Sequence, residues 1–242
     1  MLDLGIFSQD TPDGDTTWGL SLLSGFKYTL ILVALAWIVA MALGTLLGVV
    51  RTTDRRWAVR LCNAYVELFR NIPLLVQFFL WYFVIPEFIP PLKRLAIAMN
   101  PTSFQLLESV LCLGLFTSAR IAEQVKSGIL ALPRGQRLAG YAMGLTQVQT
   151  YRFVLLPMAF RIVIPPLTSE SMNLMKNSAV AYSIGLTELF FRTREMGEMT
   201  FRYFAAFGAA TVLYVLAAFA INRVFAWVER TVAIPGYIGG KT

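Results

Sequence analysis

Histidine is absent from this chain of 242 residues, cysteine occurs only twice, and charged residues make up only 14%. Without histidine the chain has no Ser-His-Asp or Cys-His nucleophilic pair, no His-ligated zinc site and no imidazole proton relay. The phosphate-binding pattern GxxxxGKS or GxxxxGKT is missing as well, so we expect that this chain does not hydrolyse a nucleotide itself. These absences argue against an enzyme and against a metal site.

Hydrophobic residues are abundant, at 57% of the sequence, and gather in five runs. A run of about 20 apolar residues is long enough to cross a bilayer as a helix. The composition therefore predicts an all-α integral membrane protein with five transmembrane helices. The predicted spans are Tyr28–Val50, Ile72–Phe88, Phe104–Gln124, Ile162–Leu186 and Tyr203–Val228.

Lysine and arginine are unevenly divided between the two sides of the predicted membrane. Of the 21 basic residues, four in residues 51–60, five in 126–161 and three after residue 222 fall on one side. Six fall on the other side, and three lie within or at the edge of a span. The positive-inside rule therefore predicts an outside N-terminus and a cytoplasmic C-terminus. The same rule explains the net charge of +7 without a nucleic-acid partner.

The two cysteines are Cys62, predicted in a cytoplasmic loop, and Cys112, predicted inside the third span. We expect them to remain unpaired and to act as small apolar side chains. No positively charged n-region precedes Lys27, and we therefore expect no cleavable signal peptide.

The segment Gly135–Leu167, between the predicted spans three and four, combines positive charges with helical patterning. Apolar residues recur at helical spacing in its first half, at Leu138, Ala142, Leu145 and Val148. This pattern predicts an amphipathic helix with one face available for docking. The charge distribution places that helix in the cytoplasm.

The same segment resembles the cytoplasmic signature of ABC importer permeases, in the polar amino acid uptake family. That signature is Glu-Ala-Ala, then Gly after three residues, then Ile-x-Leu-Pro after nine more. Here its positions are Leu138-Ala139-Gly140, Gly144, Val154 and Leu156-Pro157, so Leu138 replaces the Glu and Gly140 the second Ala. Flanking segments also match the family: Glu67–Leu75, Ser118–Ile129 and Met172–Val180.

The resemblance implies a type I ABC importer permease whose coupling helix, between spans three and four, contacts an ABC ATPase dimer. The coupling residues would be Leu138, Ala139, Gly140, Gly144 and Pro157. Small residues among them would allow close approach of the ATPase. Further implied partners are a second, homologous permease in a heterodimer, a periplasmic amino acid-binding protein and the lipid bilayer. This chain would bind no cofactor, because ATP-Mg is held by the ATPase.

The resemblance also implies a multi-pass protein of the bacterial inner membrane. It divides the chain into a periplasmic or interfacial segment, residues 1–24, a transmembrane domain, residues 25–230, and a cytoplasmic tail, residues 231–242. Within the family the chain looks most like the glutamate/aspartate permeases. We expect the first segment to hold an interfacial helix around Trp18–Gly25.

Charges inside a membrane span are costly and point to functional residues. Arg120 lies in the third span, and its planar guanidinium suits a substrate carboxylate. We predict that Arg120, with Ser118 and Glu123 nearby, lines the substrate pathway. An internal ion pair between Arg120 and Glu123, three residues apart, is an equal alternative.

The fourth predicted span also carries several polar and charged residues near its middle. Asn173, Asn177 and Ser178 are predicted wall residues of the pathway, and hydrogen bonding between helices is the alternative. Lys176 and Glu170 are assigned to gating or packing, and the sequence does not reveal the partner of Lys176.

A different functional class remains open: a stand-alone secondary amino acid transporter driven by an ion gradient, in which Lys176 and carboxylates within spans serve a proton path. Five spans and no visible internal repeat argue against it.

Overall fold

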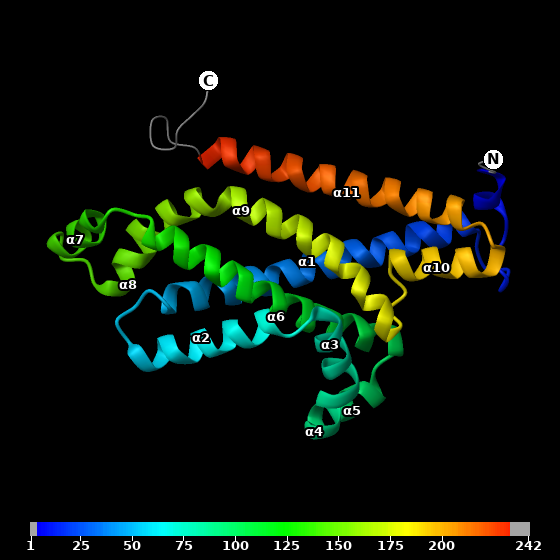
Figure 1. Ribbon diagram of the computed structural model, residues 1–242, viewed down its shortest axis with the longest axis horizontal. Coiled ribbons are helices and arrows are strands. Elements are labelled where there is room, and N and C mark those ends of the chain that lie inside the picture. Colours follow the sequence, from blue (N-terminus) through cyan, green and yellow to red (C-terminus); the bar gives the residue numbers. More distant parts are fainter. Residues whose placement is uncertain (1–3, 233–242) are drawn as a thin grey trace. The chain divides into compact units, whose positions relative to one another are not determined.

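The computed structural model describes residues 4–232, and these residues are almost entirely helical (Figure 1). No strand is assigned between residues 4 and 232, where a single isolated bridge joins Asp10 and Thr17. The predicted all-α class is therefore confirmed for the described part of the chain. The predicted tail 231–242 lies outside the described residues apart from its first two.

The helices follow one another with short connections. Their bounds are η1 Leu4–Ser8, α1 Trp18–Val50, α2 Arg56–Asn71, α3 Leu74–Phe79, η2 Leu80–Val84, α4 Ile85–Phe88, α5 Pro90–Ala98, α6 Pro101–Leu130, α7 Arg134–Ala142, α8 Gln147–Thr150, η3 Tyr151–Leu155, α9 Leu156–Asn177, η4 Ser178–Ile184, α10 Leu189–Thr200 and α11 Tyr203–Val232. Of the η segments, η2 and η3 are π-helical and η1 and η4 are 3-10 helices.

Residue contacts divide the chain into two compact units, and α1, α6, α9 and α11 each contribute to both. The described residues of unit 1 are 4–39, 72–114 and 173–219, and those of unit 2 are 40–71, 115–172 and 220–232. Each unit is described by itself below.

Four stretches of helix are long and apolar enough to span a membrane: Trp18–Val50, Pro101–Leu130, Gln147–Ile184 and Tyr203–Val232. A fifth candidate is a broken one, because Arg56–Asn71 and Leu74–Phe88 pass the same test together but meet at an angle of 104°. The described residues are thus those of a multi-pass membrane protein with four candidate spans, or five if the bent pair counts as one.

The first span begins earlier than the sequence predicted. α1 runs without a break from Trp18 for 33 residues, about 50 Å at 1.5 Å per residue. The separate interfacial helix expected around Trp18–Gly25 is therefore the first part of α1, and the boundary drawn between residues 24 and 25 falls inside a helix. No proline lies between Trp18 and Lys27, and a single lysine can extend its amine toward the interface.

The second predicted span, Ile72–Phe88, corresponds to the helical stretch Leu74–Phe88, which passes the spanning test together with α2. The residues before it form α2, which the sequence analysis took for a loop containing Cys62. Pro73 separates α2 from α3 with an extended ψ of 138°, because proline has no N–H for a helical hydrogen bond and restricts the residue before it. Both Cys62 and Cys112 are free thiols, as predicted.

The amphipathic helix predicted over the first half of Gly135–Leu167 is interrupted. α7 ends at Ala142, and the chain turns at Gly144, whose φ is +80°. Leu145 and Val148 therefore do not share a helix with Leu138. The residue pattern was helical, but the left-handed glycine ends the helix after nine residues.

In unit 1, buried side chains form two apolar clusters. One gathers residues of α1, α3, α6, α9 and η4 around the fully buried Phe78 and Leu113. The other joins the first turns of α1 to α10 and α11 around Trp18 and Met196. α10 was not predicted, because its four charged residues made it resemble an exposed loop.

In unit 2, small residues allow α1 and α6 to pack closely. A Cβ added at Gly44 would lie 2.7 Å from the Cβ of Ile121, and one at Gly48 would lie 2.7 Å from the Cβ of Val125. The two glycines are four residues apart and so lie on one face of α1. This is the small-residue packing that membrane helices commonly use.

Candidate functional site

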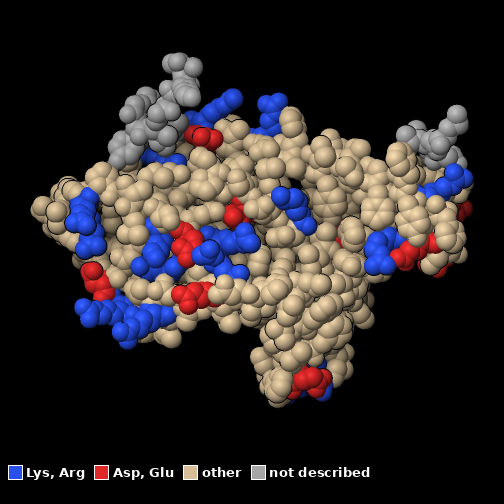
Figure 2. Space-filling model, viewed as in Figure 1, with Lys and Arg blue, Asp and Glu red and all other residues tan. Residues whose placement is uncertain are grey.

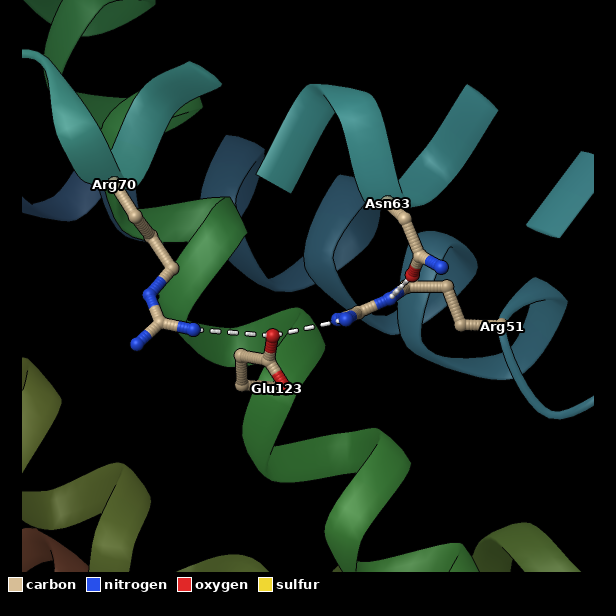
Figure 3. A network of polar contacts seen from close by, with 4 residues as sticks. All are labelled: Arg51, Asn63, Arg70 and Glu123. Carbon is tan, nitrogen blue, oxygen red and sulfur yellow. Dashed lines mark hydrogen bonds and ion pairs between the residues drawn. The ribbon is translucent and has the colours of Figure 1, made fainter. Parts of the chain in front are cut away.

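A network of charges joins three helices of unit 2 at the end of α1 (Figure 3). Arg51 follows the last residue of α1, and its Nη2 donates to Glu123 Oε1 of α6 at 2.8 Å. Its Nε donates to Asn63 Oδ1 of α2 at 2.7 Å. Arg70, in the last turn of α2, donates to the same Glu123 oxygen at 3.1 Å. Figure 3 shows the two guanidinium groups reaching that carboxylate from opposite sides.

The members of this network differ in their exposure. The side chain of Arg51 is only 5% exposed, that of Glu123 is 32% exposed and that of Arg70 is 52% exposed. A buried cation needs its partner, because an uncompensated charge away from water is expensive. The Arg51–Glu123 pair is therefore the fixed part of the network, and the exposed Arg70 contact contributes less.

Next to this network lies an open cavity of about 450 Å³. Its lining is almost wholly polar: Arg70, Arg120, Glu123, Gln124 and Glu170. Figure 2 shows blue and red side chains gathered over the part of unit 2 that holds α2 and α6, on a surface that is otherwise mostly tan. Two guanidinium and two carboxylate groups thus meet at one hollow of a largely apolar molecule.

Arg120 points into this cavity without a short ion pair. Its Nη1 lies 4.0 Å from Glu170 Oε1 of α9, and its guanidinium lies 5.1 Å from the centre of the Phe116 ring. The side chain is 44% exposed. The sequence analysis left open an ion pair between Arg120 and Glu123. The structure does not contain that pair, because the Glu123 carboxylate points toward Arg51 and Arg70.

Ser118, predicted on the pathway, is fully buried between α6 and α2. Its hydroxyl donates to the Leu115 carbonyl at 2.7 Å and lies 2.8 Å from the Tyr65 hydroxyl. Its part in transport stays a prediction.

The predicted residues near the end of α9 belong to unit 1. Asn173 and Asn177 are half-buried, and Lys176 is exposed and makes no ion pair within residues 4–232. Ser178 is buried and donates to the Met175 carbonyl at 2.7 Å, where the α-helix gives way to a 3-10 helix. The roles assigned to these residues stay predictions, as does the gating role of Glu170.

The predicted coupling residues lie on α7 and on the turn after it. Leu138 is 64% exposed, and Ala139 is exposed beside it. Gly140 is buried, because a Cβ there would lie 2.8 Å from the Thr150 side chain of α8. Gly144 forms the left-handed turn, in which its N–H donates to the Tyr141 carbonyl and the Leu145 N–H donates to the Gly140 carbonyl.

Within this chain, Gly140 uses its small size to pack against Thr150, and Gly144 uses its backbone freedom. The coupling roles assigned to Leu138, Ala139, Gly140, Gly144 and Pro157 stay predictions. Pro157 occupies the second position of α9, directly after the π-helix η3.

Arg51, Asn63, Arg70 and Gln124 were not assigned to the site by the sequence analysis. A basic residue directly after a long apolar run is a weak signal, since cations favour helix C-termini. Its partner Glu123 lies 72 residues away, and no spacing rule connects the two.

In unit 1, a second buried carboxylate ties three helices together. Glu188 is fully buried and caps α10, accepting from the Phe191 N–H at 2.8 Å. Thr29 of α1 and Tyr214 of α11 each donate a hydroxyl to Glu188 Oε2 at 3.3 Å. Burial raises the pKa of this carboxyl to about 7, because desolvation outweighs the hydrogen bonds that favour the charged form.

Comparison with known proteins defines the class. The family model described as "Binding-protein-dependent transport system inner membrane component" matches residues 40–234, and this chain belongs to that family. Glutamate/aspartate import permease protein GltJ of Escherichia coli K12 is 47% identical over 241 residues, which is 98% of this chain and 97% of GltJ. L-cystine transport system permease protein TcyB of Bacillus subtilis is 30% identical, over 86% of this chain and 85% of TcyB.

Solved structures show the same fold. An amino acid ABC transporter crystallised with histidines superposes with a TM-score of 0.73 at 25% identity, covering 88% of this chain and 95% of that one. An inward-facing MetNI methionine ABC transporter gives a TM-score of 0.72 at 23% identity, over 89% and 97% of the two chains. The predicted resemblance to ABC importer permeases of polar amino acids is thereby confirmed.

Proposed function

We propose that this chain is the permease subunit of an ATP-driven importer that carries glutamate and aspartate into the cytoplasm. The observation that carries the proposal is the 47% identity to a glutamate/aspartate import permease over nearly the whole length of both chains. Other relatives are named for cystine and glutamine, so the substrate needs support from the site itself.

Arg120 supplies that support. Its 4.0 Å contact with Glu170 is longer than a charge-assisted hydrogen bond, which spans about 2.7–2.9 Å. Its guanidinium, half exposed at a polar cavity, therefore has donors left for an incoming carboxylate. An acidic amino acid offers its side-chain carboxylate, and a neutral amino acid does not.

Membership of the family supports the following proposed arrangement in the cell. The N-terminus lies outside and the C-terminus in the cytoplasm of a bacterial inner membrane, and residues 25–230 act as the transmembrane domain. A periplasmic binding protein delivers the amino acid, and a homologous permease completes a heterodimer. GltK, another glutamate/aspartate import permease of Escherichia coli, is 28% identical over 73% of this chain, which illustrates how two related permeases occur in one species.

ATP and magnesium are bound by a separate ATPase dimer, which docks on α7 and α8. Three apolar side chains are largely exposed on and between these short helices: Leu138 at 64%, Met143 at 69% and Val148 at 76%. α7 lies outside the candidate spans, and α8 forms the first turn of the candidate span Gln147–Ile184. A protein partner would cover these side chains favourably.

Uptake by the reconstituted complex tests the proposal. The chain, its partner permease, the ATPase and the binding protein are placed in proteoliposomes, and entry of labelled glutamate is followed with and without ATP. We expect uptake to require ATP, to survive an uncoupler, and to be inhibited by unlabelled aspartate but not by arginine. Loss of uptake on adding the uncoupler at clamped ATP would instead favour an ion-driven transporter.

Arg120→Gln tests the substrate-recognition step. We expect at least a ten-fold loss of kcat/KM for glutamate, because a hydrogen bond to a charged group contributes about 1.5–3 kcal/mol. Arg94→Gln, which removes an exposed guanidinium from α5 in unit 1, should leave uptake unchanged. Intact glutamate uptake by Arg120→Gln would contradict the role of this residue.

A further inference from the structure

We propose that Tyr151 is a positioning residue that connects the α7–α8 segment to the end of α1, and that this connection transmits ATPase-driven movement to the first span. The inference rests on the proposed function, because it assumes that the ATPase docks on α7 and α8. All the contacts involved lie within unit 2.

The contact itself is short and buried. Tyr151 is 5% exposed, and its hydroxyl donates to the Thr52 carbonyl at 2.9 Å. The same hydroxyl lies 3.0 Å from Thr52 Oγ1, which also reaches the Val49 carbonyl in the last turn of α1. A tyrosine 99 residues along the chain thus closes the end of the first helix.

Thr52 belongs to a turn that is already fixed to two other helices. Its neighbour Arg51 binds Asn63 of α2 and Glu123 of α6 through the buried network described above. Two consecutive residues therefore join α1 to α2, to α6 and, through Tyr151, to η3. A displacement of Tyr151 would therefore displace the turn after α1 together with the parts of α2 and α6 that are bonded to it.

On its other side, Tyr151 follows directly after the residue on which α7 packs. Thr150 is fully buried, and it lies against Gly140 so closely that no Cβ fits there. A movement of α7 therefore presses on Thr150 and on the adjacent Tyr151. The π-helix η3, Tyr151–Leu155, starts at this point, and such wide turns often occur at functional sites.

Without Tyr151, the segment would be joined to the turn after α1 much more weakly. A second polar contact, between Arg137 of α7 and Asp54, measures 3.9 Å, and the two side chains are 41% and 81% exposed. Exposed pairs of this kind contribute little. The covalent chain transmits movement from α8 into α9, and Tyr151 adds a route to α1.

Tyr151→Phe removes the hydroxyl and keeps the ring. In proteoliposomes holding the whole complex, we measure ATPase activity with and without the substrate-loaded binding protein, together with substrate molecules imported per ATP. We expect the stimulation to fall about five-fold, the effect of one lost hydrogen bond on an equilibrium, while basal ATPase activity and complex assembly stay unchanged. A merely structural role would lower assembly or both activities together.

Tyr203→Phe is the matched control, because Tyr203 lies on α11 in unit 1, outside the docking segment, with an exposed side chain. We expect it to behave as the unsubstituted protein. Thr52→Val is a second variant: it removes Oγ1 but leaves the carbonyl acceptor, so its loss of stimulation should be smaller, and combined with Tyr151→Phe it should add little.

Full stimulation and an unchanged import ratio in Tyr151→Phe would overturn the inference, and so would strictly additive effects of the two substitutions. If Tyr151→Phe fails to assemble, Thr52→Val decides alone: reduced stimulation supports the link and full stimulation contradicts it. Failure of the proposed function is distinguishable, because the unsubstituted complex would then show no ATP-dependent uptake at all.

Discussion

At the scale of single residues, Glu188 and Glu123 show two ways of stabilising a carboxylate inside the folded chain. Glu123 is neutralised by two guanidinium groups, whereas Glu188 receives only hydroxyl and backbone donors. Neutral donors do not repay the full cost of desolvating a charge. The protonation of Glu188 is therefore coupled to the packing of α1, α10 and α11 in unit 1.

This coupling has a direction with pH. The pKa of Glu188 is about 7 in the folded protein, against 4.5 for an ordinary glutamate, so between these values the folded state binds more protons than the unfolded state. Stability therefore falls as the pH rises from about 4.5 to about 7, by about 3 kcal/mol at most, and this residue causes no further loss above that range.

Thermal unfolding of the purified protein in detergent at a series of pH values measures this effect. Glu188→Gln should flatten the dependence across the window, because the amide cannot ionise. Glu198→Gln, which removes an exposed partner of Arg194, should leave the dependence as it was. An unchanged pH profile in Glu188→Gln would contradict the assignment.

The residue scale also shows what a sequence can and cannot reveal about a site. Arg120 was found because a charge inside an apolar run stands out by itself. Its partner was left open between Glu123 and substrate, since only neighbours along one helix are visible in a sequence. Glu170 lies on another helix, and so do the partners of Glu123, Arg51 and Arg70.

At the scale of secondary-structure elements, Gly144 separates α7 from α8. Its φ is +80°, and no other atom would lie within 4 Å of an added Cβ. Gly144→Ala would therefore be penalised only by the left-handed backbone, at about 1–2 kcal/mol. We expect faster hydrogen–deuterium exchange across residues 134–150 with little change elsewhere.

Gly135→Ala is the matched control for this substitution. Gly135 lies in the first turn of α7 with open space around it and no positive φ, and alanine is favoured over glycine in a helix by about 1 kcal/mol. Exchange should be equal or slower in that variant. Equal exchange in Gly144→Ala and the unsubstituted protein would show that the turn carries no such strain.

The helices that were predicted correctly are those that can be recognised from the length of an apolar run alone. The third and fifth spans lie inside α6 and α11, and the fourth lies inside the stretch Gln147–Ile184 apart from its last two residues. α2 and α10 were missed because their charges lower the hydropathy of short helices that are stabilised by packing in the folded chain. The bend after α2 depends on Pro73 together with the surrounding contacts, which no window of hydropathy includes.

At the scale of the whole molecule, the remaining question is which ends of the helices face the cytoplasm. The two-to-one bias of basic residues predicts that α7 and α8 lie in the cytoplasm, and the proposed function gives that segment a cytoplasmic partner to contact. Both arguments fail together if the orientation is reversed, because the ATPase would then have no docking segment on its side of the membrane.

Cysteine labelling in intact cells decides the orientation. In a background with Cys62→Ser and Cys112→Ala, single cysteines are introduced by Asp13→Cys, before α1, by Met199→Cys, in α10, and by Gly135→Cys, in α7. All three positions are exposed, so access to a membrane-impermeant maleimide depends on the side of the membrane. We expect the first two to react in intact cells and Gly135→Cys to react only after the membrane is opened. Reaction of Gly135→Cys from outside would reverse the topology and remove the basis for ATPase docking on α7 and α8. Outside labelling restricted to the other two positions would place the Tyr151–Thr52 contact on the side of the membrane where ATP is hydrolysed.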